Sequence, residues 1–225
     1  MASPSVQDFA NTHVGEIAAA LPGATAIFRK HKIDFCCGGG VSLAEAAKAR
    51  NASLHDIEAA LAELGVQFER VAPQETSALI DHILDRFHAR HRAELPELIK
   101  LARRVEAVHK DHADAPRGLA AHLEHMLAEL EAHMQREEQR LFPMMLSDGC
   151  AILAFPVGQM RLEHDDHAVA IRSLDVLAHG FVTPQGACRS WQALYAGCAK
   201  FVSDLMEHIH LENNVLFPRF ERRPD

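Results

Sequence analysis

The sequence predicts an all-α protein, in which an up-down four-helix bundle follows a small helical N-terminal domain. Apolar residues recur every three or four positions over four long stretches, which is the period of helices that bury one face. Breaks rich in Gly, Pro and Asp separate these stretches. We expect the small domain at residues 1–70 and the bundle at residues 76–225.

The N-terminal domain is expected to place short helices around a glycine-rich turn. That turn runs from Asp34 to Gly40, where three glycines follow two adjacent cysteines, and no regular element tolerates it. Capping patterns that begin at Ser42 and Ser53 each open a helix after the turn. The helices expected before the turn span 14–21 and 24–31. Residues 66–75 lose the helical period and form the expected linker.

The bundle helices carry polar residues in their apolar stripes. Several histidines and two glutamates take positions at which a leucine would be ordinary. Pro96 lies inside the first helix and is expected to weaken or kink it. The four expected helices span 77–110, 119–145, 157–178 and 188–219.

Composition narrows the class of protein. With 48% hydrophobic residues among 225, the chain can build a large core, yet no apolar run approaches a bilayer-spanning length. The formal charge of -8 argues against binding to nucleic acid or an anionic membrane. The N-terminus has no secretory pattern, and five irregularly spaced cysteines suit a reducing compartment, so we expect a cytoplasmic protein.

An eleven-residue pattern, H-x3-E-x4-L-F-P, occurs twice. The first copy starts with His133 and Glu137, and the second starts with His208 and Glu212, 75 residues later. A His and a Glu four residues apart lie on one face of a helix, about one turn apart. Burying both without a ligand would be costly, so the pattern predicts a metal site.

A second repeat supplies further ligands. His88-x-x-His91 and His164-x-x-His167 start 76 residues apart, so the bundle resembles two equivalent helix hairpins. Imidazole and carboxylate ligands suit iron, manganese or zinc, and two carboxylates can bridge a metal pair about 3.5–4 Å apart. Six or more inward ligands indicate two metals, and a helical bundle of this kind favours iron. Periodicity alone does not choose between the two histidines of each pair.

The motifs together resemble the repair of iron centres family of di-iron proteins, the YtfE, ScdA and DnrN type. Its members have a hemerythrin-like bundle behind a short N-terminal domain, and the resemblance covers nearly the whole chain. It rests on Asp34-Phe-Cys-Cys-Gly-Gly39, Phe87-His-Ala-Arg-His91, the two H-x3-E-x4-L-F-P motifs and Glu163-His-Asp165.

The resemblance implies a cofactor and a role. Two non-haem irons, carboxylate-bridged and oxo-bridged, would be held by His88, His133, Glu137, His164, His208 and Glu212. The family restores iron–sulfur clusters damaged by nitric oxide or oxidants, by donating iron or by reducing nitric oxide. We therefore expect a stress-response protein with iron–sulfur enzymes as clients and nitric oxide or oxygen as ligands. Whether it is an enzyme stays open, and a homodimer is one option for its oligomeric state.

The sequence is also compatible with other functions. The chain could be a hemerythrin-like carrier or sensor of oxygen or nitric oxide without turnover, or an iron store. Cys36 and Cys37 match the family's cysteine pair, and their exposed turn favours redox or metal-transfer thiols over small core residues. His91 and His167 are interpreted as supporting or satisfied core histidines. His125 and Glu129 repeat the H-x3-E spacing by chance, and no chemistry is assigned to the remaining cysteines, Cys150, Cys188 and Cys198.

Overall fold

The computed structural model describes residues 9–64, 75–147 and 153–221. Of the predicted linker, 66–75, only Glu75 falls within these ranges, and Cys150 lies outside them. The chain divides into two compact units: unit 1 comprises Met1–Glu75 and Ile209–Arg219, and unit 2 comprises Thr76–His208 and Phe220–Asp225. The boundary thus falls within the last long helix, so unit 1 includes the end of that helix.

Unit 1 contains four short helices close to the expected positions. They are α1 (Val14–Ala20), α2 (Ala24–Lys30), α3 (Leu43–Ala49) and α4 (Leu54–Glu63). Ser42 and Glu45 form the predicted capping box at α3, and Ser53 accepts the Asp56 N–H at α4. Fully buried side chains fill the centre of the unit, among them Phe28, Phe35, Leu43, Ile57 and Leu61.

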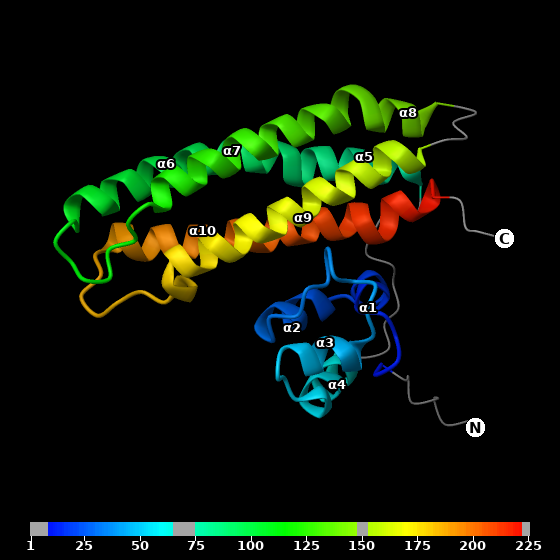
Figure 1. Ribbon diagram of the computed structural model, residues 1–225, viewed down its shortest axis with the longest axis horizontal. Helices are drawn as coiled ribbons and strands as arrows, with labels where there is room; N and C mark the ends of the chain where they lie inside the picture. The colour runs from blue at the N-terminus through cyan, green and yellow to red at the C-terminus, as the bar shows by residue number, and fades with distance from the viewer. Residues whose placement is uncertain (1–8, 65–74, 148–152, 222–225) are drawn as a thin grey trace. The chain divides into compact units, whose positions relative to one another are not determined.

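Unit 2 is a bundle of long helices that lie side by side (Figure 1). The first comprises α5 (Thr76–Ile83), a π-helical turn η1 (Leu84–His88) and α6 (Ala89–Val108). The second comprises α7 (Leu119–Arg136), a π-helical turn η2 (Glu137–Leu141) and α8 (Phe142–Leu146). The third is α9 (Ala154–Leu177), and the fourth is α10 (Arg189–Leu211). From Ile209 onward this last helix belongs to unit 1, as do the π-helical turn η4 (Glu212–Leu216) and the 3₁₀ turn η5 (Phe217–Arg219) that continue it. The predicted all-α architecture is confirmed.

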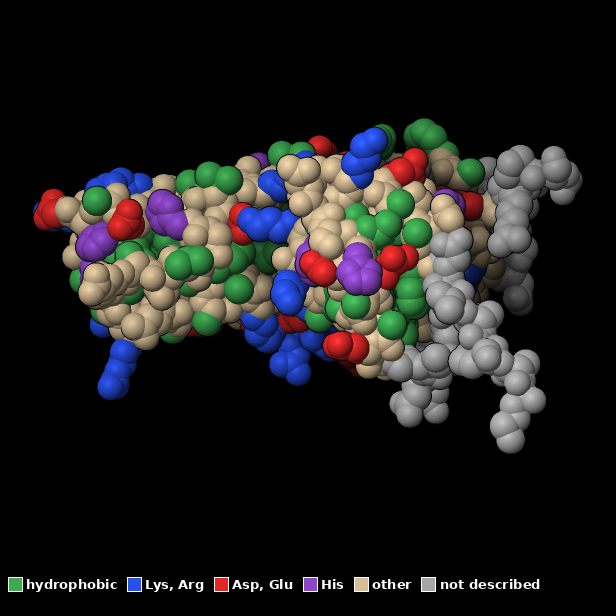
Figure 2. Space-filling model, turned by 90° about the horizontal axis from the view of Figure 1, so that it is seen from below, with side chains coloured by type: hydrophobic (Ala, Val, Ile, Leu, Met, Phe, Trp, Pro, Cys, Tyr) green, Lys and Arg blue, Asp and Glu red, His purple; other side chains and the backbone are tan. Residues whose placement is uncertain are grey.

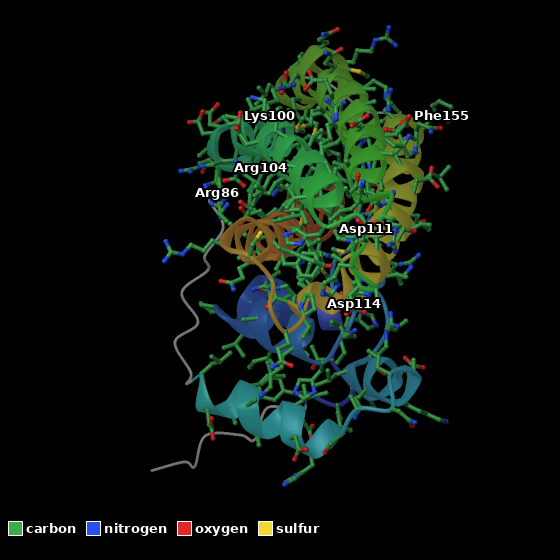
Figure 3. The ribbon with its side chains drawn as sticks, turned by 90° about the vertical axis from the view of Figure 1, so that its left-hand side faces the viewer. Arg86, Lys100, Arg104, Asp111, Asp114 and Phe155 are labelled. Carbon is green, nitrogen blue, oxygen red and sulfur yellow. The ribbon has the colours of Figure 1, made fainter. Side chains whose placement is uncertain are left out.

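The buried faces follow the predicted stripes. The stripe of each helix consists of the residues that recur every three or four positions. In α7 these residues are all buried from Leu119 to His133, and in α10 they are all buried from Leu194 to His208. The opposite faces are charged: Lys100 and Arg104 project from the outer side of α6 (Figure 3). Pro96 lies within α6 without ending it, so the expected weakening is tolerated in the packed bundle.

The surface carries charges of both signs. Acidic and basic side chains are interspersed with apolar ones on the face shown in Figure 2. One large apolar side chain, Phe155, projects from the start of α9 and is 82% exposed (Figure 3). Within the described ranges, no helix is both long enough and apolar enough to cross a bilayer.

Candidate metal centre

Six buried side chains with metal-binding atoms meet inside the bundle. Their ligand atoms form two groups, and within each group all atoms lie within 4.8 Å of one another. None of the six side chains is more than 1% exposed. One group is His88, Glu137, His208 and Glu212, and the other is His133, Glu137, His164 and Glu212. The two groups therefore share both carboxylates and differ only in their histidines.

The distances suit a pair of ions bridged by carboxylates. Nε2 of His88 lies 3.0 Å from Nε2 of His208, and Nε2 of His133 lies 3.0 Å from Nε2 of His164. Two nitrogens that each bind one ion at about 2.1 Å and at a right angle lie about 3.0 Å apart.

Glu137 reaches both groups. One of its oxygens lies 3.4 Å from Nε2 of His88, and the other lies 3.3 Å from Nε2 of His133. A single carboxylate thus faces one histidine of each pair, which is the arrangement that a bridging ligand requires.

Three π-helical turns meet this site. The turn η1 ends at His88, η2 begins at Glu137, and η4 begins at Glu212. In each, the next residue donates its N–H five positions back, as Phe142 does to the Glu137 carbonyl. Pro143 follows Phe142 and has no N–H, so the backbone hydrogen bond that this position would donate is absent there. Single π-turns of this kind are common at functional sites, but the helical period of the sequence did not predict them.

Two of the histidines are held by carboxylates at the opposite ring nitrogen. Glu138 lies 2.7 Å from Nδ1 of His88 and also accepts a hydrogen bond from Arg92. Glu163 lies 2.7 Å from Nδ1 of His133 and accepts another from Arg136. An ionised carboxylate only accepts hydrogen bonds, so Nδ1 carries the proton and Nε2 keeps its lone pair for a metal.

The same hydrogen bonds keep the carboxylates of Glu138 and Glu163 ionised. Burial opposes the ionisation of Glu163, but the hydrogen bonds from His133 and Arg136 outweigh it and lower its pKa to about 2. Burial likewise opposes ionisation of Glu138, and the bonds from Arg92 and His88 lower its pKa. Glu163 begins one of the sequence motifs and Glu138 lies within another, but neither was assigned a role from the sequence. The sequence feature that could have indicated their role is that each lies next to a predicted ligand: Glu138 follows Glu137, and Glu163 precedes His164.

His91 and His167, the second members of the two H-x-x-H pairs, pack beside the ligand group. The His91 ring lies 5.4 Å from that of His208, and the His167 ring lies 5.0 Å from that of His133. Burial, followed by neighbouring imidazoles, lowers the pKa of His91 to about 2 and that of His167 to about 3. Both therefore stay neutral. Among the described residues neither ring nitrogen of His91 has a hydrogen-bond partner, and its role as a supporting or satisfied core histidine stays a prediction.

A cavity of about 370 Å³ opens between α7 and α9 beside this site. Its lining includes His125 and Glu129, together with Glu163 and His167. The H-x3-E spacing of His125 and Glu129 does not join the metal-binding groups, but both side chains border a cavity that reaches residues in contact with His133.

The predicted thiols lie in unit 1. Cys36 is buried, Cys37 is half-buried, and neither forms a disulfide. Their turn is held by the end of the last helix, where Asn213 donates to the Cys36 carbonyl and Asn214 donates to the Phe35 carbonyl, each at 3.0 Å. These asparagines follow Glu212 directly in the chain, and sequence reasoning assigned them no role. Cys188 and Cys198 lie in the bundle, also as free thiols.

The donor set of the bundle site fits metal ions. Two fully buried carboxylates would be costly to ionise without a cation. Four imidazole nitrogens and two carboxylates, with no thiolate, are typical ligands of iron, manganese or zinc. The tautomers set by Glu138 and Glu163 leave two imidazole Nε2 lone pairs directed at this point.

Comparison with known proteins gives the same assignment. Residues 10–65 match ScdA_N, a domain of unknown function (DUF542), and residues 79–220 match the hemerythrin HHE cation binding domain. The chain is 46% identical, over 94% of its length and 97% of the relative's, to a probable iron-sulfur cluster repair protein of Haemophilus influenzae. It is 46% identical, over 92% and 95%, to the iron-sulfur cluster repair protein YtfE of Pectobacterium carotovorum. The corresponding protein of Yersinia pseudotuberculosis is 44% identical, over 94% and 97%. The chain belongs to this family of iron–sulfur cluster repair proteins with a hemerythrin-like bundle.

Proposed function

We propose that this chain is a non-haem di-iron protein that repairs iron–sulfur clusters damaged by nitric oxide or oxidative stress. The observation that carries the proposal is the pair of histidine groups that share Glu137 and Glu212. His88 and His208 would hold one iron, and His133 and His164 the other. The names of the related proteins, which describe iron-sulfur cluster repair, support this function.

Iron bound there would supply redox chemistry and binding of nitric oxide or oxygen. The protein's own residues hold and shield it. The Phe87 ring stacks on His208 at 5.4 Å and 6°, and the Phe142 ring stacks on His88 at 5.9 Å. These apolar walls keep water from the ligands, while Glu138 and Glu163 hold two of the imidazoles in position.

Repair would proceed by iron donation, by reduction of nitric oxide, or by both. Cys36 and Cys37 are proposed to relay iron or electrons, with iron–sulfur enzymes of the cytoplasm as clients. The oxo bridge and the homodimer also stay predictions. Sedimentation of the purified protein measures the oligomeric state directly.

Metal analysis tests the cofactor. The purified protein should contain about two irons per chain, as a bridged pair requires. One zinc, or no metal, would contradict the assignment. The repair function is tested by mixing the iron-loaded protein with an iron–sulfur enzyme inactivated by nitric oxide, with metal-free protein as the control. Recovered enzyme activity in the first mixture alone is expected.

A carrier or sensor of oxygen or nitric oxide is the second candidate, favoured by the enclosed, apolar-walled site. A metal centre shielded from water suits reversible binding of a small gas. Anaerobic mixing of the reduced protein with nitric oxide separates the two. Nitrous oxide production indicates reduction, whereas a stable adduct that dissociates unchanged indicates a carrier.

A further inference from the structure

We propose that Asp34, Cys36 and Cys37 form a second, mononuclear binding site for one thiophilic divalent cation. Their ligand atoms all lie within 4.8 Å of one another. This site would give the relay role proposed above for the two thiols a chemical basis. The biological purpose of the site rests on the proposed function, but the binding of the ion does not. The binding itself is measured independently of the bundle site.

The spacing of the donors suits an ion. Sγ of Cys36 lies 3.3 Å from Oδ1 of Asp34. A tetrahedral ion bonded to sulfur at about 2.3 Å and to a carboxylate oxygen at about 2.0 Å holds the two ligand atoms about 3.5 Å apart. The ion can therefore take the place of the thiol proton with little movement of either side chain.

The turn presents its donors in a fixed arrangement. Oδ1 of Asp34 accepts the backbone N–H of Cys36 at 3.2 Å and that of Cys37 at 3.0 Å. Gly38 allows this approach, because a Cβ there would lie 3.2 Å from the Asp34 carbonyl and 3.3 Å from its Cγ. The acid and both cysteines are thus already gathered, which lowers the ordering cost of binding.

The end of the last helix holds the turn from the other side, inside unit 1. Asn213 and Asn214 occupy the Cys36 and Phe35 carbonyls, and the buried Phe35 ring packs 5.6 Å from that of His210. The carbonyls of Phe35 and Cys36 therefore have hydrogen-bond partners, which help to hold the turn in this conformation.

The site should exchange its ion readily. Three protein ligands leave one tetrahedral position open, and Cys37 is only half-buried whereas Cys36 is 2% exposed. An ion would enter from the side of Cys37. This combination of thiolate ligands and an open position suits transfer of an ion rather than permanent storage.

Protons compete with the ion. A hydrogen bond with Cys37, burial and the nearby Asp34 carboxylate raise the pKa of the Cys36 thiol well above its ordinary value. The thiol is therefore protonated near neutral pH, and binding must release its proton.

Cobalt titration of the reduced, metal-free full-length protein tests the proposal. The bundle groups contain no cysteine, so thiolate-to-cobalt charge-transfer absorption reports the turn and not the bundle. We expect a band that saturates at one cobalt per chain beyond the two that the bundle site would take, disappears in Cys36→Ser and Cys37→Ser, and persists in the control variants Cys188→Ser and Cys198→Ser. Asp34→Asn should weaken binding at least about tenfold.

A second measurement needs no variant that could disturb the turn. Cobalt in excess of the two ions that the bundle site would take should protect both Cys36 and Cys37 of the wild-type protein from alkylation, as read by mass spectrometry. Absence of the band, or unprotected thiols, would overturn the inference. If metal analysis still finds two irons in that case, only this inference fails. If the band appears in a protein that never holds iron in its bundle, the proposed function fails instead.

Discussion

Glu163 accepts a hydrogen bond from Nδ1 of His133 at 2.7 Å, which sets the tautomer in which Nε2 of that histidine can bind a metal. Glu163→Gln should lower metal affinity about 10–100-fold, because the neutral amide polarises the imidazole less and releases Arg136. Competition with a chelator measures the change. Glu124→Gln is the control, since Glu124 pairs with Arg103 on the surface of the same bundle. Equal affinity in both variants would contradict the role of Glu163.

Replacing both Glu137 and Glu212 by Ala should empty the bundle site. Each of the two metal positions would keep only its two histidines as protein ligands, and the carboxylate bridge between the positions would be lost. Iron content should fall from about two per chain to nearly none, while circular dichroism still shows a helical protein. Iron content that survives the double replacement would show that neither carboxylate bridges the metals.

Gly39→Ala should destabilise unit 1 by about 1–3 kcal/mol. The added Cβ would lie 2.8 Å from the Phe35 carbonyl, 3.0 Å from the Asn214 side chain and 3.0 Å from Gly15 Cα. Gly40→Ala is the matched control, because a Cβ there meets nothing within 4 Å. Urea unfolding compares the two variants, and a similar loss in both would mean that the turn is not tightly packed.

Asp204 should stabilise the bundle only above the pH at which it ionises. Burial opposes its ionisation, but hydrogen bonds from Arg86 and Lys200 outweigh this and lower its pKa from the ordinary 3.8. Its contribution is thus complete above about that pH and is lost as pH falls through the lower folded value.

Asp204→Asn should therefore cost about 1 kcal/mol at pH 7, a modest figure because both cations are partly exposed. The difference from wild type should shrink below pH 4. Urea unfolding of the metal-free protein at pH 7 and pH 3.5 measures it. Glu97→Gln, which removes an exposed pair with Lys100, should change little at either pH.

Much of the fold was predictable because the local sequence pattern of a helix indicates where it lies. The period of apolar residues located the long helices, and Ser42 with Glu45 marked a helix start that the structure confirms. The π-turns were not predictable in this way. A turn of five residues differs from one of four by a single position, and the sequence pattern around Glu137 is compatible with both.

In the candidate site, too, some features were predictable from the sequence and others were not. By itself the sequence determined the repeat of His and Glu, because residues four apart in a helix must share a face. Helical periodicity did not decide which histidine of each pair faces the carboxylates: the family resemblance implied His88 and His164, and the tertiary structure places these two beside the carboxylates. Nε2 of His88 lies 3.4 Å from Glu137, whereas His91 packs against Phe201. Rotation of one helix against its neighbours makes that choice, as it does the pairing of His133 with Glu163. Such contacts join distant parts of the chain and leave no local periodic signal.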